Sequence, residues 1–446
     1  MASTSTELVN RLIDNIQNAH PIYWAVGIGS LIVPYILFRK TSSQLQEAPS
    51  PSQVVKMEEP HTVVVLGASL TGLPITHYLV KHIAPGKKNL KVILVSPNTD
   101  FMWNLATVRG VLPDIVSQDK YFYPIAPTFK NYPAASQFEF IVGKAGALDP
   151  TGQTVKVNVN GGSDREVKYD TLIIATGASD RNGLPFKNLN TTEETKAAIT
   201  KLQQDIKAAK SVVVAGAGHT GCEVVGELGQ EYSSTGQKEV ILIANDNLPL
   251  DPSALNSVRQ TIATYLKKLG VRIIPSSRVT SVTKSAAGRT VLEVTQKDGS
   301  KQTIETDVYI PAFGVVPNSQ FAPDHMLDSS KRFKQTTGLR VEGYDNIFVM
   351  GDVGNLQGAN AKSADDQVIH MRKMMGAYFE GKPLPIYTPD SSIMFGVSLG
   401  RKGGSGQAMG MKLLSILVWY LKGRYLGTNY AGEVAAGNRT MQATKW

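Results

Sequence analysis

Cysteine is almost absent from the sequence: Cys222 is the only one among 446 residues. A single thiol excludes an intrachain disulfide, a CxxC redox pair and a cysteine-based zinc site. Tryptophan is also scarce, with 4 residues against 40 glycines, which favours a turn-rich α/β protein over a helical bundle. The net charge is +9, but no Lys/Arg stripe is interleaved with aromatic residues, so we expect no nucleic-acid partner. The length predicts roughly two or three domains.

One long run lacks charge altogether. Residues 21–38, PIYWAVGIGSLIVPYILF, carry no charged side chain, and Arg39 and Lys40 follow directly. The run is about as long as the shortest bilayer span, ~18 residues. A signal peptide would need a basic region before it, whereas the first twenty residues hold more acidic than basic side chains. We predict a transmembrane signal anchor over residues 21–40.

The anchor divides the chain into a short tail and a long folded part. Residues 1–20 form the N-terminal tail, and the Ser-, Gln- and Pro-rich residues 41–59 are typical of a flexible linker. Arg39 and Lys40 predict a single-pass membrane protein with its folded part in the cytosol. The mitochondrial outer membrane and the endoplasmic reticulum both fit this topology.

The first Gly-rich turn lies at the start of the folded part. Residues 63–66 form an apolar run, as in a central parallel strand. Gly67, Ser69 and Gly72 follow as G-x-S-x-x-G and precede an apolar-periodic stretch that predicts a helix. A helix N-terminus after such a turn is suited to a pyrophosphate. Ser69 departs from the strict G-x-G-x-x-G pattern but is small.

A second turn of the same kind follows about 150 residues later. Residues 212–215 predict a strand, Gly216, Gly218 and Gly221 form G-x-G-x-x-G, and residues 223–231 predict a helix. One such motif is weak evidence, but two between strands and helices indicate two dinucleotide sites. The sequence therefore predicts an α/β fold with two Rossmann-like domains.

The acidic residue that usually accepts from a ribose hydroxyl is harder to find. After the apolar run 91–96, Ser96 or Asn98 stands where an acid is expected. After 239–244 the chain continues Asn-Asp, and Asp246 is the candidate acceptor. No arginine nearby would pair with a 2′-phosphate, which favours NADH mildly over NADPH.

Three further stretches have the form of a strand that ends in glycine. They are YDTLIIATGAS (169–179), TDVYIPAFGVVPN (306–318) and NIFVMGDVGN (346–355). With these stretches in this order, the chain resembles the two-dinucleotide-domain flavoprotein oxidoreductases. Within that group, residues 61–446 resemble the apoptosis-inducing-factor-like branch with its ferroptosis-suppressor-protein-like members. The resemblance implies that the first turn binds FAD and that the second binds NADH or NADPH.

The resemblance also implies roles for individual residues. Thr176 and Gly177 would lie against FAD, and Asp352, after Gly351, would accept from a ribityl hydroxyl. Glu223 matches the acidic residue near the nicotinamide. The segments AKSADDQVIH and FMWNLATVRG resemble stretches beside and behind the flavin, and they place Lys362 and Arg109 near it. Lys362 would stabilise reduced flavin, or is an ordinary surface lysine; both interpretations stay open.

We expect a discontinuous FAD-binding domain formed by residues 60–188 and 314–380. The NAD(P)H-binding domain, 189–313, is inserted between its parts, and residues 381–446 form a C-terminal extension. Residues 411–427 of the extension are mostly apolar with basic ends. Contact with membrane lipid, a homodimer interface and packing on the FAD domain are the alternatives for this segment.

The missing CxxC pair bears on the electron acceptor, because disulfide reductases of this superfamily pass electrons to such a pair. Cys222 alone cannot do so, and we expect it to be structural. A membrane-anchored flavoenzyme has quinones at hand, so the leading hypothesis is an NAD(P)H:quinone oxidoreductase. Two alternatives remain: a tailoring oxidoreductase that acts on a small metabolite, and an NADH-binding flavoprotein with a signalling or scaffold role.

Overall fold

The computed structural model describes residues 60–446. The predicted tail, anchor and linker, residues 1–59, lie outside the described residues. Within the described part of the chain, no helix combines the length and apolar character that a membrane crossing requires.

The first sheet has seven strands in the order β18-β8-β1-β2-β5-β6-β7. Its parallel part pairs Val64 with Ile93 on one side and with Leu172 on the other. These strands are buried on both faces, which explains their continuous apolar sequence. The strands are β1 (His61–Leu66), β2 (Leu90–Ser96), β5 (Phe138–Asp149), β6 (Thr154–Val159), β7 (Arg165–Lys168), β8 (Thr171–Ile174) and β18 (Ile347–Val349).

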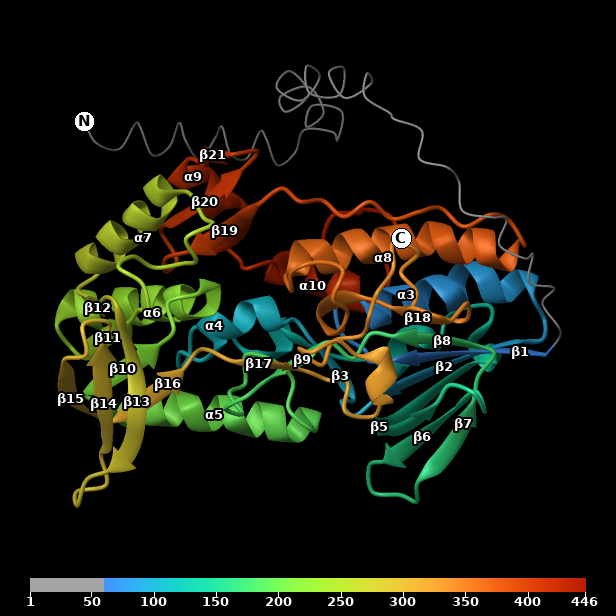
Figure 1. Ribbon diagram of the computed structural model, residues 1–446, viewed down its shortest axis with the longest axis horizontal. Helices are drawn as coiled ribbons and strands as arrows, with labels where there is room; N and C mark the ends of the chain where they lie inside the picture. The colour runs from blue at the N-terminus through green and yellow to red at the C-terminus, as the bar shows by residue number, and fades with distance from the viewer. Residues whose placement is uncertain (1–59) are drawn as a thin grey trace. The chain divides into compact units, whose positions relative to one another are not determined.

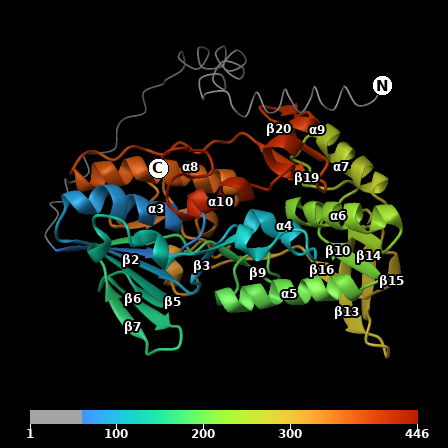
Figure 2. The same cartoon turned by 180° about the vertical axis from the view of Figure 1, so that it is seen from behind.

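Two helices lie along one face of this sheet, side by side in both views (Figures 1 and 2). They are α3 (Gly72–Tyr78), which continues as a π-helical turn over Leu79–Ile83, and α8 (Ala361–Phe379). Strand β18 and helix α8 follow the second sheet in sequence. The first sheet is therefore formed by two separate parts of the chain.

The second sheet has four parallel strands in the order β12-β11-β10-β16. Its strands are β10 (Ser211–Ala215), β11 (Glu239–Ile243), β12 (Arg272–Ile274) and β16 (Val308–Pro311). The helices of this part are α5 (Thr192–Ala208), α6 (His219–Glu231) and α7 (Asn256–Lys268). A separate antiparallel sheet is formed by β13 (Ser277–Lys284), β14 (Thr290–Gln296) and β15 (Lys301–Thr306).

Short elements connect the two sheets and complete the molecule. Strand β9 (Ala178–Asp180) pairs with β17 (Val315–Pro317), so the chain leaving the first sheet lies beside the chain returning to it. Between β2 and β5 lie β3 (Asp100–Met102), α4 (Thr107–Gly110) and β4 (Phe122–Pro124). The C-terminal segment contains β19 (Phe395–Ser398), β20 (Gly404–Ala408), β21 (Met411–Lys412), α9 (Ser415–Val418), a π-helical turn at Trp419–Gly423 and α10 (Thr428–Ala435).

One apolar cluster includes residues of the first and second sheets and of the C-terminal segment. It includes Val63 of the first sheet, Val212 of the second and Val397 of the C-terminal segment. The C-terminal segment is therefore packed into the same core as both sheets. Its residues also contact the helices that follow the Gly-rich turns.

Candidate active site

The first Gly-rich turn joins β1 to α3 and forms a cradle that only glycine permits. Gly67 has a φ of +101°, in the left-handed region. A Cβ atom on Gly67 would lie 2.3 Å from the carbonyl oxygen of Ala175, and one on Gly72 would lie 1.8 Å from the carbonyl oxygen of Gly67. Ser69, in the middle position, is half-buried, and its carbonyl accepts from the N–H of Leu73. The helix can thus start close to the strand.

The second turn, between β10 and α6, has the same geometry. Gly216 has a φ of +103°, and a Cβ atom there would lie 2.7 Å from the carbonyl oxygen of Ala312. A Cβ atom on Gly221 would lie 1.9 Å from the carbonyl oxygen of Gly216. Gly218 is exposed, and a Cβ atom on it would have no heavy atom of the described residues within 4 Å. Open space therefore lies over the N-terminus of α6, where a phosphate group is favoured.

The strand ends predicted to border the first site do meet there. Strands β18, β8 and β1 are parallel neighbours, so their carboxyl ends lie at one edge of the sheet. Ala175, before Thr176 and Gly177, touches Gly67 as described above. A Cβ atom on Gly351 would lie 3.1 Å from the side chain of Thr71 at the start of α3. The structure therefore brings Thr176, Gly177 and Gly351 to the first turn.

The ATG stretch is fixed to the chain that returns from the second sheet. The hydroxyl of Thr176 donates to the carbonyl of Asn318 at 2.7 Å. The side-chain amide of Asn318 donates back to the carbonyl of Thr176 at 2.9 Å, and its backbone N–H donates to the carbonyl of Gly177. These bonds hold the loop at the junction of the two sheets.

Asp352 has a partner that the sequence did not indicate. Its carboxylate lies 2.9 Å from the ammonium group of Lys187, and both side chains are partly buried. Lys187 lies in the connection before α5 and belongs to no recognisable motif. The predicted ribityl acceptor is thus half of an ion pair at the edge of the first sheet.

The ribose position of the first site holds a buried amide in place of an acid. Asn98 is 2% exposed, and its side-chain N–H donates to the carbonyl of Leu189 at 3.2 Å. Its Oδ1 atom is buried without a hydrogen-bond partner. Ser96 accepts from the backbone N–H of Asn98. An unpaired buried acceptor is rare in a folded protein, and Asn98 fits a hydroxyl donor at the position where the acid is missing.

Asp246, the candidate at the second site, is in a different environment. Its carboxylate lies 2.8 Å from the ammonium group of Lys297, and the side chain is 32% exposed. Lys297 comes from the turn between β14 and β15, far from Asp246 in sequence. The sequence near Asp246, which lacks an arginine, gives no indication of this lysine.

Arg109, expected near the flavin, is buried among protein groups. Its Nε atom donates to Glu227 on α6 at 2.8 Å, and its terminal nitrogens donate to the carbonyls of Gly423 and Arg424. The structure therefore uses Arg109 to join α4 to α6 and to the C-terminal segment. The resemblance gave its neighbourhood and no indication of these partners.

Three glutamates line one side of α6 at intervals of four residues, and each has a cationic partner. The pairs are Glu223–Lys422 at 2.6 Å, Glu227–Arg109 at 2.7 Å and Glu231–Arg401 at 2.6 Å. Two of the cations come from the C-terminal segment. The Glu227 side chain has no exposed surface, and burial outweighs the Arg109 guanidinium and raises the pKa of Glu227.

Glu223, the predicted nicotinamide-side acid, is held in place from the C-terminal segment. Its Oε1 atom accepts from the backbone N–H of Ser398 at 2.9 Å and from Lys422. His219, one turn earlier on α6, packs edge-on against Phe395 with ring centroids 4.7 Å apart. Sequence reasoning missed Ser398 and Lys422 because they lie about 175 to 200 residues away along the chain.

Lys362 lies in the first turn of α8 and faces two carboxylates. Its ammonium group lies 2.7 Å from Asp366 and 2.9 Å from Asp390. Burial lowers the pKa of Lys362, but the hydrogen bonds to these two carboxylates outweigh it, so the pKa is raised. Lys362 therefore stays protonated, and both of its ion-pair partners are protein groups.

Cys222, the only thiol, follows Gly221 inside α6. It has no exposed surface, and its Sγ atom donates to the carbonyl of Ala217 at 3.3 Å. Burial raises the pKa of this thiol. A buried protonated thiol is a packing group and a poor nucleophile.

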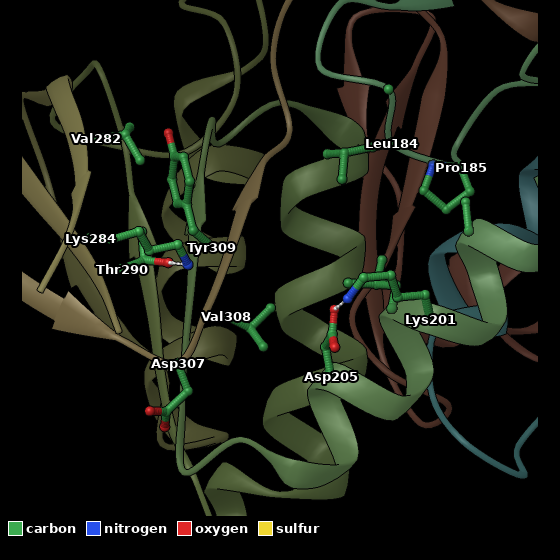
Figure 3. A pocket seen from close by; sticks show the side chains of 13 residues that line it. Leu184, Pro185, Lys201, Asp205, Val282, Lys284, Thr290, Asp307, Val308 and Tyr309 are labelled. Atoms are coloured by element: carbon green, nitrogen blue, oxygen red, sulfur yellow. Dashed lines mark hydrogen bonds and ion pairs between the residues drawn. The ribbon is translucent and has the colours of Figure 1, made fainter. Parts of the chain in front are cut away.

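A pocket of about 400 Å³ lies away from both Gly-rich turns. Figure 3 shows it between α5 and the strands β13, β14 and β16. Its charged side chains include Lys201, which pairs with Asp205, and Lys284, which donates to Thr290. None of the residues predicted to bind a cofactor lines this pocket.

Comparison with known proteins agrees with this geometry. Residues 61–370 match the family described as pyridine nucleotide-disulphide oxidoreductase, and the chain belongs to this family. Members of the family bind FAD and NAD(P)H, and the chain is an oxidoreductase of this class. The two Gly cradles and the unpaired Oδ1 atom of Asn98 fit two dinucleotides.

Individual relatives come from several groups. Oxidoreductase ptaL of Pestalotiopsis fici is 34% identical over 80% of this chain and 94% of its own length. Oxidoreductase phnG of Penicillium herquei is 32% identical over 81% of this chain and 93% of its own length. Human ferroptosis suppressor protein 1 is 26% identical over 82% of this chain and 93% of its own length.

Solved structures show the same fold. The sulfide:quinone oxidoreductase of Aquifex aeolicus superposes with a TM-score of 0.67 at 18% identity, covering 85% of this chain and 92% of its own. NDH2 of Plasmodium falciparum in complex with NADH superposes with a TM-score of 0.65 at 14% identity, covering 84% of this chain and 97% of its own. At these identities the likeness establishes the architecture alone.

Proposed function

We propose that this protein is a membrane-associated, FAD-dependent NAD(P)H oxidoreductase that passes electrons to a quinone-type acceptor. One observation carries the proposal. The chain belongs to a family named for disulfide chemistry, yet its one thiol, Cys222, is fully buried in a helix. This chain has no redox disulfide of its own to accept the electrons, so they must pass to another acceptor.

The two cradles divide the binding work in this proposal. Gly67, Ser69 and Gly72 hold the FAD pyrophosphate at the start of α3, and Asn98 accepts from the ribose. When bound, FAD supplies the centre that accepts a hydride and releases electrons to the acceptor. The FAD-binding domain comprises residues 60–188 and 314–380.

The second cradle presents the reductant. Gly216, Gly218 and Gly221 bind the NAD(P)H pyrophosphate at the N-terminus of α6, in a domain of residues 189–313. Glu223 orients the nicotinamide, because Ser398 and Lys422 hold its carboxylate in one position. In this proposal Lys362 lies beside the flavin and stays protonated through its pairs with Asp366 and Asp390.

Membrane attachment belongs to the proposal too. Residues 21–40 would anchor the chain, with the catalytic part in the cytosol at the mitochondrial outer membrane or the endoplasmic reticulum. A quinone dissolved in the same bilayer would then be the nearest lipid-soluble acceptor.

An anaerobic titration of the detergent-purified full chain tests the proposal. We expect a flavin absorption band that bleaches with about one equivalent of NADH or NADPH and recovers on addition of a short-chain quinone. A folded protein without a flavin band would contradict the FAD site. Reoxidation that needs an added small metabolite would favour the tailoring oxidoreductase, and slow reoxidation by every acceptor would favour a signalling flavoprotein.

A pair of variants tests the role of Glu223. Glu223→Gln should slow flavin reduction by NADH at least about tenfold, because the nicotinamide is no longer held in a reactive position. Glu231→Gln changes the same chemistry on the same side of α6 and should leave the rate within about twofold, since the partly exposed Glu231–Arg401 pair contributes little. Equal rates in both variants would remove Glu223 from the site.

A further inference from the structure

The C-terminal segment exposes a face of large apolar side chains. Met409, Met411, Leu414, Ile416, Leu421 and Tyr425 are each between 42% and 73% exposed. They lie at the tip of the β20–β21 hairpin, on α9 and on the turn that follows it. We call them the C-terminal apolar patch. Exposed apolar residues gathered in this way mark an interaction site.

In the helical part of the patch, buried and exposed side chains alternate along the segment. Val418 is 2% exposed and packs against Gly404 of β20, where a Cβ atom would lie 2.7 Å from it. Lys422, one turn later, reaches inward to Glu223. Leu414, Leu421 and Tyr425 of the same segment are each at least 42% exposed. The polar anchor is therefore inside, and the apolar side chains are in solvent.

The charge around the patch has one sign. Residues 391–432 contain five Lys or Arg and no Asp or Glu. Arg401 and Lys422 are paired inward with glutamates of α6. Lys402, Lys412 and Arg424 make no ion pair with any residue that the structure describes. They remain available to an anionic partner beside the apolar side chains.

The neighbouring helix extends this positive region. Helix α7 packs against β20, and both views show it next to α9 (Figures 1 and 2). Residues 252–292 contain no Asp or Glu, and Lys267 and Lys268 at the end of α7 are exposed. A second copy of the chain would bring the same cations against these ones, which costs free energy. An anionic lipid surface brings the opposite charge and a medium for the apolar side chains.

We propose that the C-terminal apolar patch docks on the surface of an anionic bilayer. Leu414, Ile416 and Leu421 enter the boundary of the acyl chains, while Lys402 and Lys412 contact the headgroups. The proposal goes beyond the proposed reaction and does not depend on it, because docking needs neither cofactor. It sets which face of the folded part meets the membrane.

A single-cysteine label on the full chain tests this contact. Cys222 is buried, so Ser415→Cys at the exposed start of α9 can be labelled with an environment-sensitive dye. Ser281→Cys on β13 is the matched control, since it is exposed and its strand lies low in Figure 1, whereas α9 lies near the top. The readout is quenching of the dye by spin-labelled acyl chains. Membrane insertion of residues 21–38 alone would not bring a dye at position 415 to the acyl chains.

We expect several-fold stronger quenching at 415 than at 281 in vesicles of phosphatidylcholine and phosphatidylserine. Lys402→Glu with Lys412→Glu should lower this quenching and its dependence on phosphatidylserine. A label at 415 that stays in water in every vesicle overturns the proposal. A label shielded without lipid, in proportion to protein concentration, also overturns it and indicates a second copy. Flavin bleaching by NADH is measured separately, so failure of one proposal leaves the other standing.

Discussion

Helices α3 and α6 follow the two Gly-rich turns, and they begin alike but are held differently. The first glycines of the turns have φ values of +101° and +103°. A Cβ atom on the third glycine would lie 1.8 Å from the carbonyl oxygen of the first glycine in the turn before α3, and 1.9 Å from it in the turn before α6. Beyond the turn, α3 meets the C-terminal segment through a neutral histidine, whereas α6 meets it through charged glutamates.

The histidine of α3 is fully buried and uses both ring nitrogens. Nε2 of His77 donates to the carbonyl of Ala435 at 2.9 Å, and Nδ1 accepts from the hydroxyl of Tyr132 at 2.9 Å. The ring also stacks on Phe129 with centroids 4.2 Å apart. The cradle is therefore a shared device, and the contacts further along each helix decide how the C-terminal segment supports it.

The largest expected effect comes from filling either cradle. Gly72→Ala should abolish flavin binding, because the new methyl group would meet the carbonyl of Gly67 at 1.8 Å. Gly221→Ala should leave flavin bound but unreduced by NADH, because the same clash occurs in the second turn. Flavin absorbance measures flavin binding, and titration with NADH measures flavin reduction in the two variants. Gly86→Ala, where a Cβ atom meets nothing within 4 Å, is the control.

A protein that loses flavin in Gly221→Ala as well would contradict the separation of the two sites. Circular dichroism must show folded protein in each case. If Gly72→Ala fails to fold, Ser69→Val tests the same cradle, because its bulk lies where the pyrophosphate approaches and outside the contact between the two glycines.

The second largest effect is expected from the ion pairs that the glutamates of α6 form. Arg109→Met leaves Glu227 buried without a partner and should lower the free energy of unfolding by about 3–5 kcal/mol. Arg401→Met removes the partner of Glu231, whose side chain is 30% exposed, and should cost at most about 1 kcal/mol. Denaturant unfolding measures both variants. Equal losses would mean that burial does not distinguish the two pairs.

The neutral support of α3 should show itself in the pH dependence of stability. Burial lowers the pKa of His77 from 6.5 to about 4. The unfolded chain then binds the proton first, so stability is fully present above pH 6.5 and is lost as the pH falls toward about 4. The loss should be about 3 kcal/mol. It is measured as the difference in unfolding free energy between pH 7 and pH 4.

A variant isolates this contribution from other titrating groups. His77→Asn is less stable at every pH, but its stability should fall less steeply between pH 6.5 and about 4. An unchanged slope would show that folding does not lower the pKa of His77. Glu227 should contribute a slope of the opposite sign, because its raised pKa makes the folded protein bind a proton before the unfolded chain, so Glu227→Gln should make the loss of stability on acidification steeper.

Much of the fold could be predicted from local patterns. The strand–Gly–helix turns at Gly67 and Gly216 depend on neighbours in sequence. The strands predicted at 212–215 and 239–244 are present in the second sheet as β10 and β11, with ends that differ by one residue. The partners of the site residues could not be predicted. Lys422 reaches Glu223, Lys187 reaches Asp352 and Lys297 reaches Asp246 from distant parts of the chain. Such pairs follow from packing, which no local motif encodes.

The smallest expected effect concerns the ribose side, where the two sites also differ. The first site has the buried, neutral Asn98, and the second has Asp246 paired with Lys297. Asp246→Asn removes a negative charge that repels a 2′-phosphate and frees Lys297 to bind one. We expect the preference for NADH over NADPH to fall about fivefold, or about 1 kcal/mol. The ratio of kcat/KM for the two reductants measures it.

Asp298→Asn provides the matched control, because Asp298 is exposed and bonds Ser300 in the same turn. It removes the same charge one residue from Lys297 without releasing the ion pair. If both variants shift the preference equally, the general charge of the turn acts on the phosphate and Asp246 has no local role. If only Asp246→Asn shifts it, the second site reads the ribose through an ion pair, whereas the first site presents an uncharged acceptor.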